Sequence, residues 1–188
     1  MEEAVKQFIF SLAPFSEDDF VNALPYFKTE VIQKDDYFSK AGRYCDRLGF
    51  VVDGLLRSFY IIKDKEATTF FLSPGSVAVA LLSFLQTKPA IENIQALKTS
   101  TLITIKKKDI EVLYKENWKW QQAGRVLIEN YYIKMEQRSI SLQSKSAQEL
   151  YVEFTREFPE IIKSVPLHYI ASYLGVSPET LSRIRKIR

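Results

Sequence analysis

Four polar side chains near the C-terminal end of the sequence are spaced so that a helix would place them on one face: Glu179, Ser182, Arg183 and Lys186. In the DNA major groove, a carboxylate can accept a hydrogen bond from cytosine N4, and an arginine can donate two to guanine O6 and N7. Glu179 and Arg183 are therefore candidates for base contacts. Thr180 and Ser182 could reach either a phosphate or a base edge.

The other basic residues of this segment suit contacts with phosphates, which add affinity but carry no sequence information. They are Arg185, Lys186 and Arg188. The chain carries a net charge of +4 from Lys163 onward, whereas residues 1–36 carry −5. Only the C-terminal end therefore suits a nucleic acid.

Two helices joined by a tight turn are expected to position these side chains. The first is predicted to start at Pro166, because proline suits the first turn of a helix. Gly175 is expected to end this helix in the left-handed conformation. Glycine adopts this conformation at no steric cost, because it has no Cβ atom. An apolar stripe at helical spacing supports this helix. It consists of Leu167, Ile170, Ala171 and Leu174.

The second helix is expected to begin directly after the turn. Ser177 is a good cap, Pro178 suits the first helical position, and Glu179 lies in the first turn, where the helix dipole favours an anion. Leu181 and Ile184 would face inward, leaving the polar face outward. The competing interpretation is an ordinary helical hairpin with a solvated charged face.

The segment YIASYLGVSPETLSRIRK resembles the DNA-reading helix-turn-helix of the Crp/Fnr family of bacterial transcription regulators, and is nearest to its Bacteroidetes-type branch. In that family the glutamate and arginine of a GxSxETxxRI pattern read bases, and the resemblance assigns these roles to Glu179 and Arg183. Some members carry arginine where this chain has Pro178, so its operator is expected to differ from theirs. The resemblance implies double-stranded DNA as a partner, and RNA polymerase as a further one.

The sequence upstream of Asp109 predicts a small β-barrel or jelly roll, because short segments typical of β-strands alternate with residues typical of turns. The pieces are Lys28 to Ile32, Leu48 to Val52, Leu55 to Ile62, Ala67 to Leu72 and Leu102 to Ile105. The turn signals are Asp35-Asp36, Ala41-Gly42, Asp53-Gly54, Lys63-Asp64-Lys65 and Pro74-Gly75. Helices are expected from Ala4 to Leu12 and after a cap at Ser16.

This region resembles the cyclic-nucleotide-binding sensor domain of Crp/Fnr regulators. In such domains an arginine and a glutamate of a short cassette after the Pro-Gly turn hold the cyclic phosphate and ribose. The resemblance places Val79, Ala80, Ala90 and Ile91 at those positions. Burying an unpaired phosphate is costly, so cyclic AMP is not expected to bind, and the effector is an unknown small molecule or none. The plain alternative is that residues 77–85 form a buried helix or strand.

The stretch from Asn117 to Leu142 can form one continuous helix of about 39 Å. Two neighbouring apolar stripes run along it, as in a helix that pairs with a second one. One stripe is Trp120, Leu127 and Tyr131, and the other is Ile128, Tyr132, Met135 and Leu142. The resemblance makes this the dimerisation helix of a homodimer on a pseudo-palindromic operator, with two recognition helices about 34 Å apart. Alternatively, the stripes pack only against their own chain.

The predicted fold class is therefore α+β, in three parts. A β-barrel or jelly-roll sensor domain spans residues 1–116, a dimerisation helix spans 117–142, and a helix-turn-helix domain spans 143–188. Within the last part, a helix is expected from a cap at Ser146 to about Phe158. Gly124 would permit a close approach between paired helices, or a local bend.

The sequence shows no catalytic motif, so we expect a regulator and no enzyme. His168 has no second ligand at metal spacing, and no metal or other cofactor is expected. Cys45 lies between two arginines that could lower its pKa, although an ordinary half-buried thiol is the simpler interpretation. The absence of a long apolar run or leader predicts no membrane partner and a cytoplasmic protein. The alternative function is a small-ligand or protein-interaction module that does not bind DNA.

Overall fold

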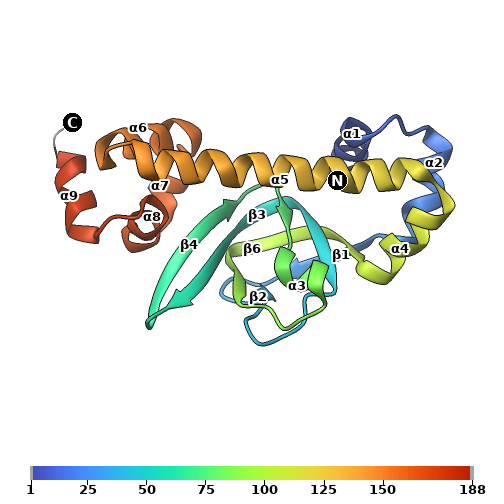
Figure 1. Ribbon diagram of the computed structural model, residues 1–188, viewed down its shortest axis with the longest axis horizontal. Coiled ribbons are helices and arrows are strands. Elements are labelled where there is room, and N and C mark those ends of the chain that lie inside the picture. The colour runs from blue at the N-terminus through green and yellow to red at the C-terminus, as the bar shows by residue number, and fades with distance from the viewer. Residues whose placement is uncertain (1, 187–188) are drawn as a thin grey trace.

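A computed structural model describes residues 2–186 and shows an α+β architecture (Figure 1). The long helix α5 (Trp118–Ser144) crosses the molecule, with an antiparallel sheet on one side of it. The helices α1 and α2 lie at one end of α5, and the helices α6 to α9 lie at the other. Arg188, expected to contact phosphate, lies outside the described residues.

The sheet has the strand order β1-β6-β3-β4, with β2 paired to β6 and β5 paired to β3. All of these pairs are antiparallel. The strands are β1 (Lys28–Ile32), β2 (Tyr37–Ser39), β3 (Arg47–Ile62), β4 (Lys65–Leu72), β5 (Val77–Ala78) and β6 (Glu92–Lys106). The expected mixture of a strand-rich first part and a helical second part is confirmed.

The prediction of two separate strands on either side of Asp53-Gly54 was wrong. The chain passes through this point as the single strand β3, with a register shift against β6. Gly54 adopts a φ of +98° and lies against Ser100, whose hydroxyl accepts a hydrogen bond from the Leu55 N–H at 3.0 Å. The glycine therefore forms an irregularity within a strand, and does not reverse the chain.

Strand β6 begins at Glu92, ten residues before the expected start at Leu102. Its first half pairs with β3 as far as Tyr60 opposite Glu92. Both faces of this half are largely covered, so it shows no simple alternation of apolar and polar residues. The local pattern gave no strand signal for that reason.

Several helices follow their capping signals. The helix α2 (Glu17–Ala23) starts after Ser16, whose hydroxyl and the carboxylate of Asp19 form a reciprocal capping box. Ser146 and Glu149 form the same motif at α6 (Ala147–Glu157). The remaining helical elements are α1 (Glu2–Leu12), η1 (Leu24–Tyr26), α3 (Leu81–Gln86), α4 (Lys107–Glu116), α7 (Ile161–Ser164), α8 (Leu167–Leu174) and α9 (Pro178–Lys186).

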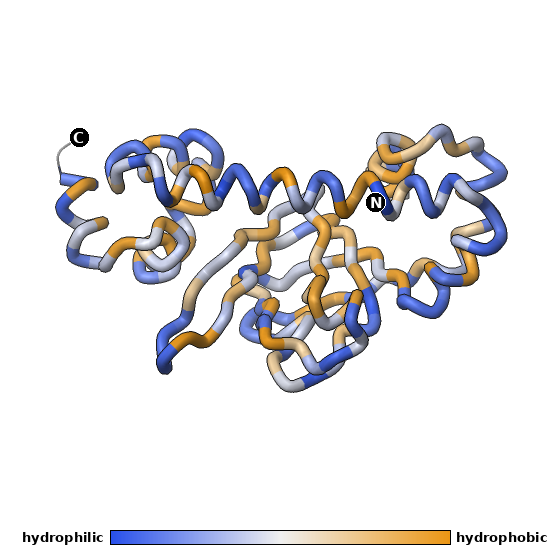
Figure 2. The backbone as a smooth tube through the Cα atoms, in the orientation of Figure 1, coloured by the Kyte–Doolittle hydropathy of each residue, from blue (hydrophilic) through white to orange (hydrophobic). Residues whose placement is uncertain are grey.

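The buried hydrophobic residues form separate clusters. One joins α1, α2 and α4 to the start of α5, another lies inside the sheet, and a third joins the helices α6 to α9 to Leu55 and Phe71 of the sheet. Figure 2 shows hydrophobic and hydrophilic residues alternating along α5. The helix α5 therefore starts in the first of these clusters and runs to the end of the molecule where the helices α6 to α9 lie.

Candidate nucleic-acid interface and adjoining cavity

The helices α8 and α9, here called the C-terminal helix pair, are joined by the turn that was predicted. Gly175 has a φ of +69°, and the Val176 N–H donates to the Ala171 carbonyl at 3.0 Å. Helix α8 begins at Leu167, one residue later than expected. Pro166 precedes the helix, because its ψ of 135° is extended.

Helix α9 begins as its capping residues predict. The Thr180 N–H donates to the Ser177 hydroxyl at 3.2 Å, and Pro178 is the first helical residue. Leu181 is completely buried against the rest of the C-terminal helices, and Ile184 packs beside it. The inward face of α9 is therefore fixed by the core, which determines which side chains point outward.

The outward face of α9 carries the polar residues that the spacing placed there. Glu179, Ser182, Arg183 and Lys186 are exposed, as is the cap Ser177, and Thr180 is half-buried. The Arg183 Nη2 donates to the Thr180 hydroxyl at 3.3 Å. A hydrogen bond from Ser177 lowers the pKa of Glu179, so this carboxylate is ionised at neutral pH.

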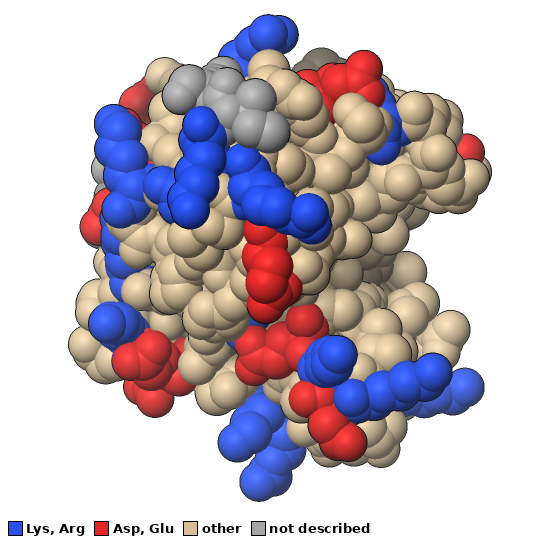
Figure 3. Space-filling view, turned by 90° about the vertical axis from the view of Figure 1, so that its left-hand side faces the viewer, with Lys and Arg blue, Asp and Glu red and all other residues tan. Residues whose placement is uncertain are grey.

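Figure 3 views the end of the molecule that the C-terminal helices form. A group of lysine and arginine side chains lies at the upper left of this view, with acidic side chains directly below it, and the lower part carries both signs of charge. The basic residues in the last turn of α9 are Arg183, Arg185 and Lys186. The surface next to the candidate base contacts therefore has the charge that phosphates require.

The C-terminal helix pair is docked on the edge of the sheet through Ser172 of α8. The Ser172 hydroxyl accepts a hydrogen bond from the Thr68 N–H at 2.9 Å and donates one to the Glu66 carbonyl at 2.7 Å. Strand β4 is an edge strand, so these backbone groups have no neighbouring strand. Ser172 therefore satisfies a donor and an acceptor that the sheet leaves open.

Arg57 of β3 forms a second part of this contact. Its guanidinium lies between the Phe59 ring at 3.9 Å and the Tyr169 ring of α8 at 3.5 Å, and its side chain is completely buried. The Arg57 Nη2 pairs with the Glu66 carboxylate at 2.7 Å. One buried cation thus joins the sheet to the helix pair by stacking.

Arg138 of α5 makes a third contact with the helix pair. It donates to the Tyr173 carbonyl at 2.5 Å and stacks over the Tyr173 ring at 3.9 Å. Sequence reasoning missed Arg57, Arg138 and Ser172. Their partners lie far away along the chain, and no local pattern signals such a contact.

The four cassette positions carry no charge. Val79 is half-buried, Ala80 and Ala90 are buried, and Ile91 is 62% exposed. The idea of one buried element over residues 77–85 was wrong: the short strand β5 is followed by α3, whose Leu82 and Leu85 are 52% and 54% exposed.

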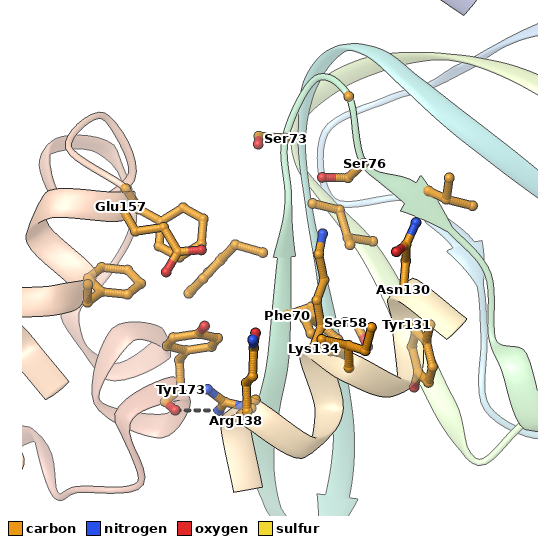
Figure 4. Close-up of a pocket in the computed structure, with 18 of the residues that line it drawn as sticks. Ser58, Phe70, Ser73, Ser76, Asn130, Tyr131, Lys134, Arg138, Glu157 and Tyr173 are labelled. Carbon is orange, nitrogen blue, oxygen red and sulfur yellow. Dashed lines mark hydrogen bonds between the residues drawn. The ribbon is translucent and has the colours of Figure 1, made fainter. Parts of the chain in front are cut away.

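A cavity of about 660 Å³ lies between the sheet, α5 and the C-terminal helices (Figure 4). The strands β3 and β4 contribute Ser58 and Phe70, the turn between β4 and β5 contributes Ser73 and Ser76, and the helix α5 contributes Tyr131. Across the cavity lie Glu157 and Tyr173 from the C-terminal helices. Val79 also lines it. The sheet, α5 and the C-terminal helices therefore meet at this cavity.

Glu92 is the buried acid of the cavity. Its residue exposure is 8%, and its carboxylate accepts a hydrogen bond from the Ser58 hydroxyl. Burial raises the pKa of Glu92. Burial, followed by the nearby charge of Glu92, raises the pKa of Tyr60 to about 12. The sequence did not identify Glu92 as a cavity residue, because the early start of β6 at this residue was not visible in the pattern.

The two apolar stripes of α5 have different surroundings. Trp120, Leu127 and Tyr131 pack against their own chain. In the other stripe, the exposed fractions are 40% for Ile128, 65% for Tyr132, 37% for Met135 and 42% for Leu142. Only the first stripe is thus covered within one chain.

Gly124 does permit a close approach, but with a helix of its own chain. A Cβ atom there would collide with the Tyr114 hydroxyl of α4. The packing of α4 on α5 therefore accounts for this glycine.

Cys45 is buried, and burial raises its pKa more than the charge of Arg47 lowers it, which agrees with the simpler interpretation of an ordinary thiol. His168 is exposed, with its ring 4.1 Å from that of Tyr169. Within residues 2–186, no cluster of three or more histidine, cysteine or acidic residues could hold a metal ion. No helix in that range combines the length and apolar character needed to cross a membrane.

Residues 29–117 match the family described as the cyclic nucleotide-binding domain. No curated protein sequence shows significant similarity to the chain. Among solved structures, FixK2 from Bradyrhizobium japonicum is 20% identical with a TM-score of 0.69, and the match covers 85% of this chain and 83% of that one.

Two further solved structures are similar over most of their length. The c-di-GMP responsive global regulator CLP of Xanthomonas campestris has a TM-score of 0.68 at 13% identity, covering 91% of this chain and 90% of that one. The catabolite activator protein of Thermus thermophilus has a TM-score of 0.60 at 18% identity, covering 96% and 85%. The chain thus shares the fold of Crp/Fnr-type regulators.

Proposed function

We propose that the chain is a sequence-specific DNA-binding transcription regulator of the Crp/Fnr type, nearest the Bacteroidetes-type branch. The observation that carries this proposal is the outward face of α9, where Glu179 and Arg183 are exposed one turn apart beside basic residues. The C-terminal helix pair acts as the helix-turn-helix, with α9 in the major groove. Glu179 and Arg183 read bases, and Ser177, Thr180, Ser182 and Lys186 contact the backbone or base edges.

The active form is a homodimer joined along α5. The stripe that includes Ile128 and Tyr132 is exposed in the single chain, and a second copy of the same helix would cover it. A two-fold axis along this seam would present two copies of α9 to successive major grooves. The operator would then be pseudo-palindromic.

Residues 1–116 act as the sensor, residues 117–142 as the dimerisation helix and residues 143–188 as the DNA-binding domain. The sensor does not use cyclic AMP, because Val79, Ala80, Ala90 and Ile91 supply no charge for a phosphate. The protein acts in the cytoplasm by binding, without catalysis, and RNA polymerase is its further partner.

DNA binding is tested by titrating promoter fragments with the purified chain over a range of salt concentrations. Arg183→Ala and Glu179→Ala should each weaken binding to a preferred fragment about 5- to 150-fold, and weaken binding to unrelated fragments much less. Lys186→Ala should weaken binding to all fragments similarly and lower the salt slope by about 1. Lys88→Ala, far from α9 in the sequence, serves as the control.

If neither Arg183→Ala nor Glu179→Ala changes the preference among fragments, the chain is a ligand-binding or protein-interaction module and not a regulator. Dimerisation is tested separately by sedimentation. Tyr132→Glu should convert a dimer to a monomer, whereas Ile62→Glu, at an exposed position on the β3–β4 hairpin, should leave the dimer intact. A dimer that survives Tyr132→Glu would contradict the seam on α5.

A further inference from the structure

The buried carboxylate of Glu92 lies at the cavity without a cation beside it. One of its oxygens accepts a hydrogen bond from Ser58, and its second oxygen has no hydrogen-bond partner among the residues that the structure describes. Within the same residues, Glu92 takes part in no salt bridge. A buried carboxylate normally has a charged partner, so this group is poised to receive one from a ligand.

Aromatic rings line the cavity on the side of the sheet and α5. The Phe70 and Tyr131 rings lie 6.0 Å apart and both line it. Tyr60 pairs with Glu92 in the register of β3 and β6. An acid combined with aromatic faces attracts organic cations, because the faces of the rings carry negative charge.

The basic residues of the lining do not make an anion site. The Arg138 guanidinium already holds the Tyr173 carbonyl and ring, and Lys134 belongs to an exposed part of α5. Three acids line the cavity, Glu92, Glu153 and Glu157, against these two bases. The balance of charge therefore favours a cation.

We propose that the cavity binds a small organic cation, a protonated amine with an apolar body, whose ammonium group pairs with Glu92. The volume of about 660 Å³ is within the usual range for small-molecule sites. The apolar body would lie against Phe70 and Tyr131, and the ammonium group would satisfy the free carboxylate oxygen. The proposed ligand is positively charged. The cyclic nucleotides for which the matched domain family is named carry a negatively charged phosphate.

Hydrogen bonds and one peptide link between Thr69 and Thr68 connect Glu92 to the C-terminal helix pair. The Ser58 hydroxyl, which donates to Glu92, also lies 2.8 Å from the Thr69 hydroxyl. Thr69 is the extra residue where the β3–β4 register shifts, and its neighbour Thr68 donates to Ser172 of α8. Binding at Glu92 would thus act on the contact that holds the helix pair. The effect on the helix pair rests on the proposed function, whereas the binding of a cation at Glu92 does not.

The test uses the full chain and probes of one shape and different charge: cyclohexylammonium, cyclohexanol and cyclohexanecarboxylate. Each is titrated at pH 7.5 without DNA, and binding is followed by chemical-shift changes of the methyl groups. We expect cyclohexylammonium to bind at least tenfold more tightly than cyclohexanol, and cyclohexanecarboxylate to bind weakest. Cyclic AMP, added as a fourth probe, should not bind.

In Glu92→Gln the two affinities for cyclohexylammonium and cyclohexanol should come within about twofold of each other, because the charge pair is lost. The control is Glu153→Gln, since Glu153 lines the same cavity but is 48% exposed in its side chain and paired with Lys145. It should retain the preference for the ammonium. Unchanged thermal unfolding at pH 5 would show that Glu92→Gln is folded.

The proposal is overturned if cyclohexanecarboxylate or cyclic AMP binds best, or if Glu92→Gln keeps the preference for the ammonium. It is also overturned if no ammonium binding is seen at about 10 mM, because small probes in a suitable site reach millimolar affinity. A failure of DNA binding would leave these results unaffected, since no DNA is present.

Discussion

Ser172→Ala is expected to loosen the C-terminal helix pair from the sheet. The Ser172 hydroxyl forms two hydrogen bonds with the backbone of β4, at 2.9 Å and 2.7 Å. Each such bond contributes about 0.5–1.5 kcal/mol net. Ser172 is half-buried, so water can partly replace the lost partner, and the expected cost is about 1–2 kcal/mol. The undocked population should therefore rise about 5- to 30-fold.

Hydrogen exchange followed by mass spectrometry measures this population directly. Amides of α8 and the β4 edge that exchange through undocking should exchange about 5 to 30 times faster in Ser172→Ala. Peptides from α1 and β1, which do not contact the helix pair, should be unchanged. Ser182→Ala is the matched control, because Ser182 is an exposed serine of α9 for which no hydrogen bond is found within residues 2–186. Both changes alter helix propensity similarly.

Equal exchange in Ser172→Ala and Ser182→Ala would refute this reasoning. The Ser172 hydroxyl would then contribute nothing to docking, and the stacked cations Arg57 and Arg138 and the hydrophobic cluster with Leu55 and Phe71 would hold the helix pair. Faster exchange throughout the chain would also refute it, because the effect would be on global stability.

Three further outcomes are expected. Gly54→Ala should lower the free energy of unfolding, measured by thermal denaturation, by about 2 kcal/mol, because Gly54 has a φ of +98° and Ser100 fills the space of a Cβ atom. Gly75→Ala should cost only about 1 kcal/mol in the same assay, because the space around a Cβ atom at Gly75 is open. Glu92 has a raised pKa in the folded state, so its contribution to stability is present below its unfolded pKa and is lost as pH rises through the folded value. Glu92→Gln should therefore remove the fall in the free energy of unfolding that begins above the unfolded pKa, and an unchanged pH profile would contradict this. Cys45 is buried with a raised pKa, so iodoacetamide should label it much more slowly at pH 8 than after unfolding in urea, and equal rates would contradict this burial.

The helix pair was predictable because its signals are local. Gly175 must adopt a positive φ to end α8, and Ser177 must cap α9, so a few adjacent residues determine the turn. The same holds for the hairpin at Lys63 and Asp64, both with positive φ. In such segments the backbone conformation follows from the residue types alone.

The rest depends on contacts between distant residues. Asp53-Gly54 has the composition of a turn, but the chain continues because Ser100 of β6 accepts the Leu55 N–H. The docking of α8 joins Ser172 to Thr68, 104 residues apart. The sequence could not indicate that Glu92 lines a cavity, because the cavity forms only where β3, β6 and α5 meet in the folded chain.

Selection of binding sites from a random pool of DNA duplexes tests the central claim most directly. The wild-type chain should enrich a two-fold symmetric sequence whose half-sites are about 10 base pairs apart, and Arg183→Ala should lose enrichment at one position in each half-site. A pool that remains random, or an enriched sequence that Arg183→Ala leaves unchanged, would contradict the assignment of α9 as a DNA-reading helix.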